Sequence, residues 1–221
     1  MELSDIAEKI ANNSRLTPSE LDFWKQSMRE TQLRNSFLAG NIDSRNQLSI
    51  ESSFQLIFKE RFESNKATVS FDVPAGFDHL FIMGSGSITT ANGGNVWAQF
   101  NGDTGNNYQW QFVKADNTTI SGTQDTSDPY IVLGVFGTTG AGAGVNGSFF
   151  AKIIHYGSDT WKKNVISEIY TAEFNDLYLA GSTWANTTPI RNIEIFATDN
   201  TLAKGTASIA AGSIITVYAT R

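Results

Sequence analysis

Cysteine is absent from the 221-residue sequence, which excludes several kinds of structure and chemistry. Without a thiol, the chain can form no disulfide framework, no thiolate zinc site and no cysteine nucleophile. Its stability therefore has to come from packing, to which oligomerisation can add. Charged residues are also scarce, at 17% against about a quarter in an average protein.

Two kinds of run are missing as well. The sequence contains no basic run, and its formal charge of -6 opposes the neutralisation of phosphates, so we expect no nucleic-acid partner. It contains no apolar stretch of about 18 residues, so we expect no membrane insertion. The opening Met-Glu-Leu-Ser-Asp lacks the basic and apolar regions of a signal peptide, which predicts synthesis in a cytoplasm.

The first 40 residues have the pattern of a helical arm. Thr17, Pro18 and Glu20 form a capping box with proline at the first helical position, and Gly40 is a typical terminator. The apolar stripe of this arm is larger than one helix can bury against itself, so we interpret the arm as an attachment or oligomerisation element. The residues expected to contact another copy or another protein are Leu21, Trp24, Met28, Phe37 and Leu38.

Residues 41–49 are polar and predict a linker, after which residues 50–221 change to the period-two pattern of β-strands. The aromatic content of 12%, with 15 phenylalanines, also suits a sheet-based core. Eleven candidate strands follow, with turn signals between nearly all of them: Phe54–Phe62, Thr68–Val73, His79–Gly84, Asn95–Asn101, Tyr108–Lys114, Tyr130–Phe136, Ser148–Tyr156, Asn164–Tyr170, Leu177–Gly181, Ile190–Thr198 and Ser213–Ala219.

Many strands without a βαβ rhythm favour a mainly β fold, specifically an antiparallel jelly-roll-like β-sandwich preceded by the helical arm. Strands such as 79–83 and 131–136 are apolar on both faces. These faces need a cover, which can be a second layer, another copy of the chain or the arm.

Four segments carry a resemblance to a known class of proteins. They are Val69-Ser-Phe-Asp-Val-Pro-Ala-Gly-Phe-Asp-His-Leu, Phe100-Asn-Gly-Asp-Thr-Gly-Asn-Asn-Tyr, Trp184 with Pro189-Ile-Arg-Asn-Ile-Glu-Ile, and Ala211-Gly-Ser-Ile-Ile-Thr-Val-Tyr. Together they resemble structural proteins of tailed-bacteriophage virions over residues 67–221. The resemblance implies a jelly-roll-like head-decoration, fibre or tail-associated protein, and it implies a homotrimer.

Three motifs have both a chemical and a structural interpretation. The alternating oxygens of residues 101–107 suit a calcium loop, but Phe112 stands where the loop needs a bidentate glutamate, so a tight hairpin is favoured. Residues 142–147 match GxGxxG, but a strand follows them where a dinucleotide site needs a helix. His79 and His155 lie in apolar strand patterns, which favours core or interface histidines over catalytic ones.

Carboxylates and aromatics leave two further alternatives open. Glu168, Glu173 and Asp176 are ordinary acids by sequence, although folding can assemble a carboxylate pair for glycan hydrolysis. The aromatics Trp97, Tyr108, Trp110, Tyr130 and Trp184 are expected in the core instead of in a sugar-binding platform. Trp161, in a polar segment, is the candidate glycan contact.

We therefore expect a virion structural protein of capsid or tail, without a catalytic, cofactor or metal site. Its expected partners are copies of itself and other virion proteins. A receptor- or glycan-binding module of a phage fibre, which attaches to a host surface glycan, is the alternative.

Overall fold

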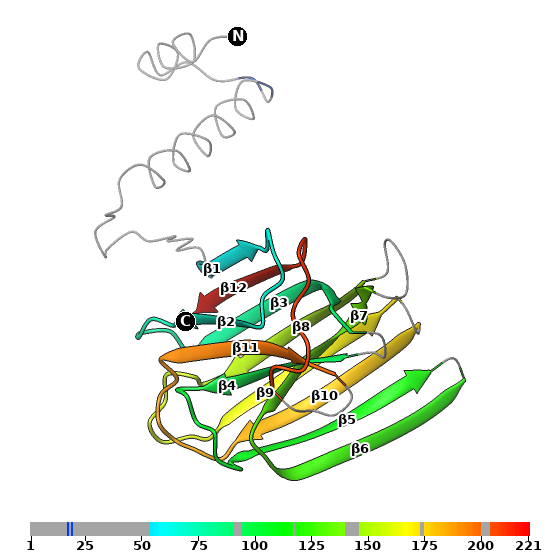
Figure 1. The fold of residues 1–221 in the computed structure, drawn as a ribbon. Helices are drawn as coiled ribbons and strands as arrows, with labels where there is room; N and C mark the ends of the chain where they lie inside the picture. The colour runs from blue at the N-terminus through cyan, green and yellow to red at the C-terminus, as the bar shows by residue number, and fades with distance from the viewer. Residues whose placement is uncertain are drawn as a thin grey trace, which may run out of the picture. The chain divides into compact units, whose positions relative to one another are not determined.

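The computed structural model describes residues 17, 19, 54–90, 94–116, 118–139, 146–172, 175–199 and 204–221. The chain divides into two compact units, residues 1–52 and 53–221, and the following description concerns the second (Figure 1). The predicted helical arm and linker, with Leu21, Trp24, Met28, Phe37 and Leu38, lie outside the described residues.

The described part of the chain is mainly β, as its alternating sequence predicts. It contains twelve strands: β1 (Gln55–Arg61), β2 (Thr68–Asp72), β3 (His79–Ile88), β4 (Gly94–Phe100), β5 (Tyr108–Asp116), β6 (Thr119–Asp128), β7 (Ile131–Thr138), β8 (Gly147–Ile154), β9 (Lys163–Thr171), β10 (Asp176–Trp184), β11 (Asn192–Thr198) and β12 (Ile214–Thr220).

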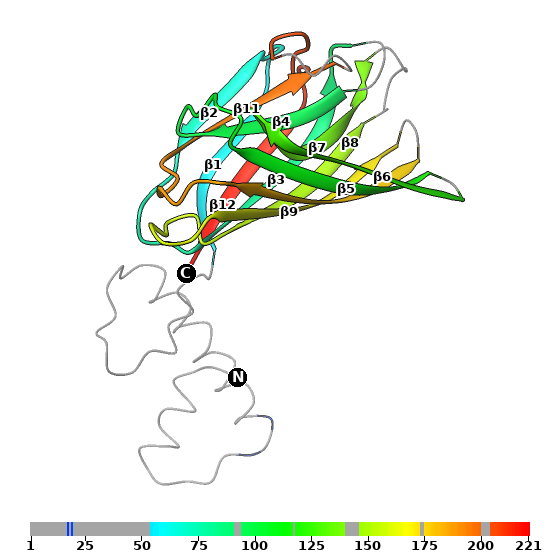
Figure 2. The same cartoon turned by 90° about the horizontal axis from the view of Figure 1, so that it is seen from below.

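The twelve strands belong to one mixed hydrogen-bonded sheet with two antiparallel sections. The eight-stranded section has the order β1-β12-β3-β8-β9-β10-β5-β6, and the four-stranded section has the order β2-β11-β4-β7. They are connected where the end of β3 runs parallel to β7, at Ser87 opposite Gly137 and Ile88 opposite Thr138. Figure 2 shows the two sections from below.

The two sections pack face to face, and the core lies between them. Aromatic rings meet across the layers: Phe136 of β7 lies 5.6 Å from Phe149 of β8, and Trp97 of β4 lies 5.7 Å from Trp110 of β5. Each buried aromatic removes a large apolar area from water, so these contacts hold the layers together. The described unit is therefore sandwich-like, although its strands are hydrogen-bonded into a single sheet.

The strand pairing is nested in sequence. β1 pairs with β12, β2 with β11, β3 with β8, and β4 with β7. The remaining strands form two hairpins, β5–β6 and β9–β10, which lie side by side because β5 pairs with β10. These hairpins extend the eight-stranded section beyond β8.

The strands that are apolar on both faces differ in their surroundings. β7 is buried along its whole length, as expected for a covered strand. In β3, Leu80 and Ile82 are fully buried, whereas His79, Phe81 and Met83 on the opposite face are only partly buried. The second face of β3 belongs to a surface that the four-stranded section does not cover.

Candidate functional site

The candidate site is the face of the eight-stranded section that points away from the four-stranded section, called the outer face below. Ten large apolar side chains are exposed in the described part of the chain, and all of them except Trp161 lie on or beside this face. The nine are Phe54, Leu56, Val113, Ile120, Phe150, Ile166, Tyr170, Leu177 and Leu179. Since isolated exposed apolar residues are normal, the concentration on one face is the informative feature.

Strand register makes these side chains neighbours. Leu179 of β10 lies opposite Val113 of β5, and Leu177 lies opposite Tyr170 of β9. Opposite residues of an antiparallel pair point to the same face, so the side chains join into a patch across three strands. Leu177 and Leu179 are each 57% exposed, so the described strands and connections do not cover the patch.

The apolar surface continues toward β1 through a chain of ring contacts. Phe150 of β8 lies 5.6 Å from Phe81 of β3, and Phe81 lies 5.0 Å from Phe54, which directly precedes β1. Phe54 also lies 6.4 Å from Tyr218 of β12. The outer face is therefore apolar across much of the width of the eight-stranded section.

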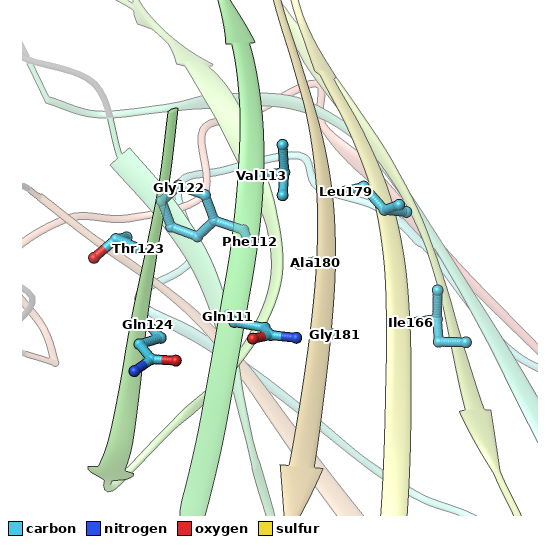
Figure 3. Close-up of a pocket in the computed structure, with 10 residues that line it drawn as sticks. All are labelled: Gln111, Phe112, Val113, Gly122, Thr123, Gln124, Ile166, Leu179, Ala180 and Gly181. Atoms are coloured by element: carbon cyan, nitrogen blue, oxygen red, sulfur yellow. The ribbon is translucent and has the colours of Figure 1, made fainter. Parts of the chain in front are cut away.

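A shallow hollow interrupts the patch over β5, β6 and β10 (Figure 3). Val113, Leu179 and Ile166 project beside it, and Gln111 and Gln124 lie at one end. Its floor includes Gly181, where a Cβ would meet no heavy atom within 4 Å.

Two opposite charges lie within the apolar part of the outer face. Glu168 of β9 is opposite Phe150 on one side and Leu179 on the other, and Lys152 of β8 is opposite Phe81 and Ile166. The Lys152 ammonium lies 5.5 Å from the centre of the Phe81 ring, and neither charge forms an ion pair with a described residue.

The two histidines lie together at one end of the outer face. Their ring centres are 5.3 Å apart, and the backbone N–H of His155 donates to Nδ1 of His79 at 3.3 Å. Burial, followed by the charges of Lys152 and His155, lowers the pKa of His79. His155 is exposed and His79 is partly buried, so neither histidine is a core residue.

Residues 101–107 connect β4 of the four-stranded section to β5 of the eight-stranded section. The predicted hairpin is wrong, because β4 pairs with β7 and β11 whereas β5 pairs with β6 and β10, so the segment crosses between the two layers. The Asp103 carboxylate accepts hydrogen bonds from the indole N–H of Trp184 at 2.7 Å, the N–H of Gly105 at 2.9 Å and the side chain of Asn107. These donors occupy the oxygens that a calcium ion would need. Asn101, with φ of 53°, binds the N–H groups of Arg191 and Asn192.

The 101–107 connection thus joins two segments that are remote in sequence and that both belong to the virion-like motifs. Burial by itself would raise the pKa of Asp103, but the hydrogen bonds from Trp184, Gly105 and Asn107 outweigh it and keep the pKa below its usual value. The motif residues in this connection therefore stabilise the path of the chain between the two sections.

The five aromatics predicted for the core are buried or partly buried, and Trp161 is exposed, as its polar segment predicts. Trp97, Tyr108, Trp110 and Trp184 are buried, and Tyr130 is partly buried against Phe196. Trp161 is 65% exposed in the connection between β8 and β9.

A buried lysine, which sequence reasoning missed, organises the Trp161 connection. The Lys163 ammonium donates to the carbonyls of Ser158 and Trp161 at 2.7 Å and of Thr187 at 2.9 Å. Burial lowers the pKa of this ammonium. A lysine next to Lys162 resembles a surface residue. The one feature of the sequence that indicates burial is alternation, which places Lys163 on the same strand face as Val165 and Ile169.

The acidic residues considered as a catalytic pair do not come together. Glu168 is exposed on the outer face, whereas Asp176 is buried on the opposite face and pairs with Lys114 at 2.7 Å, so these two acids form no catalytic pair. Glu173 lies outside the described residues. In the part of the chain that the structure describes, no group of three or more histidine and acidic side chains can hold a metal ion.

The glycine-rich motif is followed by a strand, β8, which begins at Gly147. Residues 140–145 lie outside the described residues. Gly147 and the Trp161 connection are at opposite ends of β8, about 25 Å apart at the usual rise per residue, so they form no common binding surface.

Over the described ranges, no helix is both long enough and apolar enough to span a membrane. Comparisons with protein-family models, curated proteins and solved structures find no match to this chain.

Proposed function

We propose that this chain is a structural protein of a tailed-bacteriophage virion, with a jelly-roll domain that self-associates through its outer face. The observation that carries the proposal is the concentration of nine exposed large apolar side chains on that one face. The resemblance of the sequence motifs to virion proteins supplies the biological setting, and the trimer is the preferred assembly on the same ground.

The nested strand pairing supports a jelly roll. A long antiparallel ribbon that is rolled into two layers pairs its first strand with its last, its second with its second to last, and so on inward. Without the β5–β6 and β9–β10 hairpins, the remaining eight strands follow this order, from β1 with β12 to β4 with β7. The two hairpins are then insertions that widen one layer.

Burial of the outer face supplies a driving force for assembly. Complete burial of one leucine or isoleucine side chain contributes roughly 1.5–3 kcal/mol, and the outer face offers several such residues. Symmetric self-association is the commonest way to cover such a patch, because the copies of one chain then remove one another's apolar side chains from water. In a virion, the N-terminal arm with Leu21 and Trp24 would attach this assembly to the capsid or tail.

Light scattering on the full chain tests the assembly. We expect a mass of about three times the 24.1 kDa of one chain. Leu179→Asp should shift the mass to that of one chain, because it places a charge in the centre of the apolar patch. Trp161→Asp is the matched control, since Trp161 is exposed but lies off the outer face. A monomeric wild-type chain would contradict the proposal.

Membership in a virion has its own test. Antibody labelling of purified particles from the source culture should locate the chain on the capsid or tail. Particles that lack the chain would exclude the virion assignment even if the purified chain is oligomeric.

A glycan-binding module of a fibre is the second candidate, and Trp161 favours it. An exposed indole can stack on a sugar ring, and the Lys163 hydrogen bonds hold its connection in one conformation before a ligand arrives. Binding on a glycan array that Trp161→Ala abolishes would support this function.

A further inference from the structure

We infer that Lys152 of one copy pairs with Glu168 of another, and that this pair sets the register of the outer-face assembly. The inference rests on the proposed self-association and adds to it the residues that decide how two copies align. The occupant of the outer face is therefore a second copy of this chain.

The first step concerns the position of the two charges. Phe81, Phe150, Ile166 and Leu179 are their cross-strand neighbours, so both charges lie inside the apolar patch instead of at its rim. Any molecule that covers the patch also removes water from them. A buried charge without an opposite charge is costly, so the covering surface has to provide one of each sign.

The second step concerns what is available to pair with them. Within one chain, the Lys152 ammonium lies over the Phe81 ring, and the Glu168 carboxylate makes no ion pair with a described residue. A second outer face carries the complement that is needed, one lysine and one glutamate in apolar surroundings. Charge complementarity of this kind fixes register and opposes wrong alignments, as it does in other interfaces.

The third step distinguishes pairing between copies from pairing within a chain. Lys152 and Glu168 are diagonal neighbours on β8 and β9. Reversal of both charges in one chain therefore preserves a pair within that chain as well as a pair between two copies, and it cannot distinguish them. A mixture of two singly reversed chains separates the alternatives. The Lys152→Glu chain carries two acids on its patch, and the Glu168→Lys chain carries two lysines, so only pairs between unlike chains are attractive.

The experiment uses full-length chains and measures the dissociation constant of the assembly by light scattering and sedimentation. We expect Lys152→Glu and Glu168→Lys each to weaken self-assembly by about tenfold or more, since each brings like charges together in a desolvated patch. The double reversal should restore assembly, and an equimolar mixture of the single variants should form a mixed assembly. Asp72→Lys, a reversal on exposed β2 of the four-stranded section, is the control and should leave assembly unchanged.

The outcomes separate this inference from the proposed function. A wild-type chain that stays monomeric overturns both. A wild-type assembly that tolerates Lys152→Glu, or single variants that form no mixed assembly, overturns the charge pair alone and leaves the apolar self-association standing.

Discussion

Asp103 shows how one carboxylate can connect remote parts of this chain. It accepts the Trp184 indole hydrogen 81 positions away and also fixes the turn that contains Gly105. Hydrogen bonds to a charged acceptor are stronger than neutral ones, so the charge of Asp103 contributes to the stability of the fold. This contribution has a pH dependence that can be measured.

We predict that Asp103→Asn lowers the free energy of unfolding at pH 7 by roughly 1–2 kcal/mol. Because the pKa of Asp103 is below its usual value in the folded chain, its charge stabilises the fold above the usual pKa of about 3.9. That stabilisation is lost as the pH falls through the lower, folded-state pKa. Urea unfolding should therefore show a difference between wild type and variant that shrinks from pH 7 toward pH 3.

Asp72→Asn is the control for this experiment, since exposed Asp72 has one hydrogen bond to the Asn192 side chain and lies outside the 101–107 connection. A stability difference for Asp103→Asn that is the same at both pH values would show that the lost charge is not the cause.

At the scale of the strands, side-chain size limits how closely the two layers approach. A Cβ on Gly84 of β3 would lie 2.2 Å from Cε1 of Phe149 and 3.0 Å from Cζ of Phe136. A Cβ on Gly134 of β7 would also meet Phe149, at 2.4 Å. The Phe149 ring therefore occupies the space that two glycines leave open between the layers.

We predict that Gly84→Ala destabilises the fold by about 1–3 kcal/mol, the usual cost of overpacking a core. Gly181→Ala, also in a strand of the eight-stranded section, should have little effect because nothing lies within 4 Å of its Cβ position. Thermal unfolding of both variants at one protein concentration checks this. Equal losses of stability in the two variants would mean that these glycines are needed for their backbone conformation, and not because a side chain would clash.

For the whole molecule, the division of the chain after residue 52 suggests that the β unit folds by itself. We predict that a chain lacking residues 1–40 stays folded, because its core is contained within residues 53–221. We also predict that it keeps its oligomeric mass and loses incorporation into particles. Circular dichroism, light scattering and particle labelling measure the three properties.

Normal incorporation of the truncated chain would show that residues 1–40 are not the attachment element. A truncated chain that is monomeric would show that assembly depends on these residues instead of on the outer face alone.

Alternation of apolar and polar residues is a local property, so the amino-acid sequence was enough to predict the mainly β class and eleven of the twelve strands in the described residues. It missed β6, whose ten residues include one large apolar side chain, Ile120, and are nearly all exposed. This strand exists because β5 offers it a hydrogen-bonding edge. Backbone pairing to an existing edge requires few apolar side chains, so the residues of such a strand do not identify it.

Which strand faces are covered could not be predicted in this way, because it depends on how the two layers pack. Alternation shows that Leu177 and Leu179 share a face, but whether that face meets the second layer depends on strands distant in sequence. The same holds for Lys163, whose three carbonyl partners close around it only after the β8–β9 connection and the segment after β10 come together. Burial and exposure are properties of the packed layers. The order of strand pairing that creates those layers cannot be inferred from the residues of any single strand.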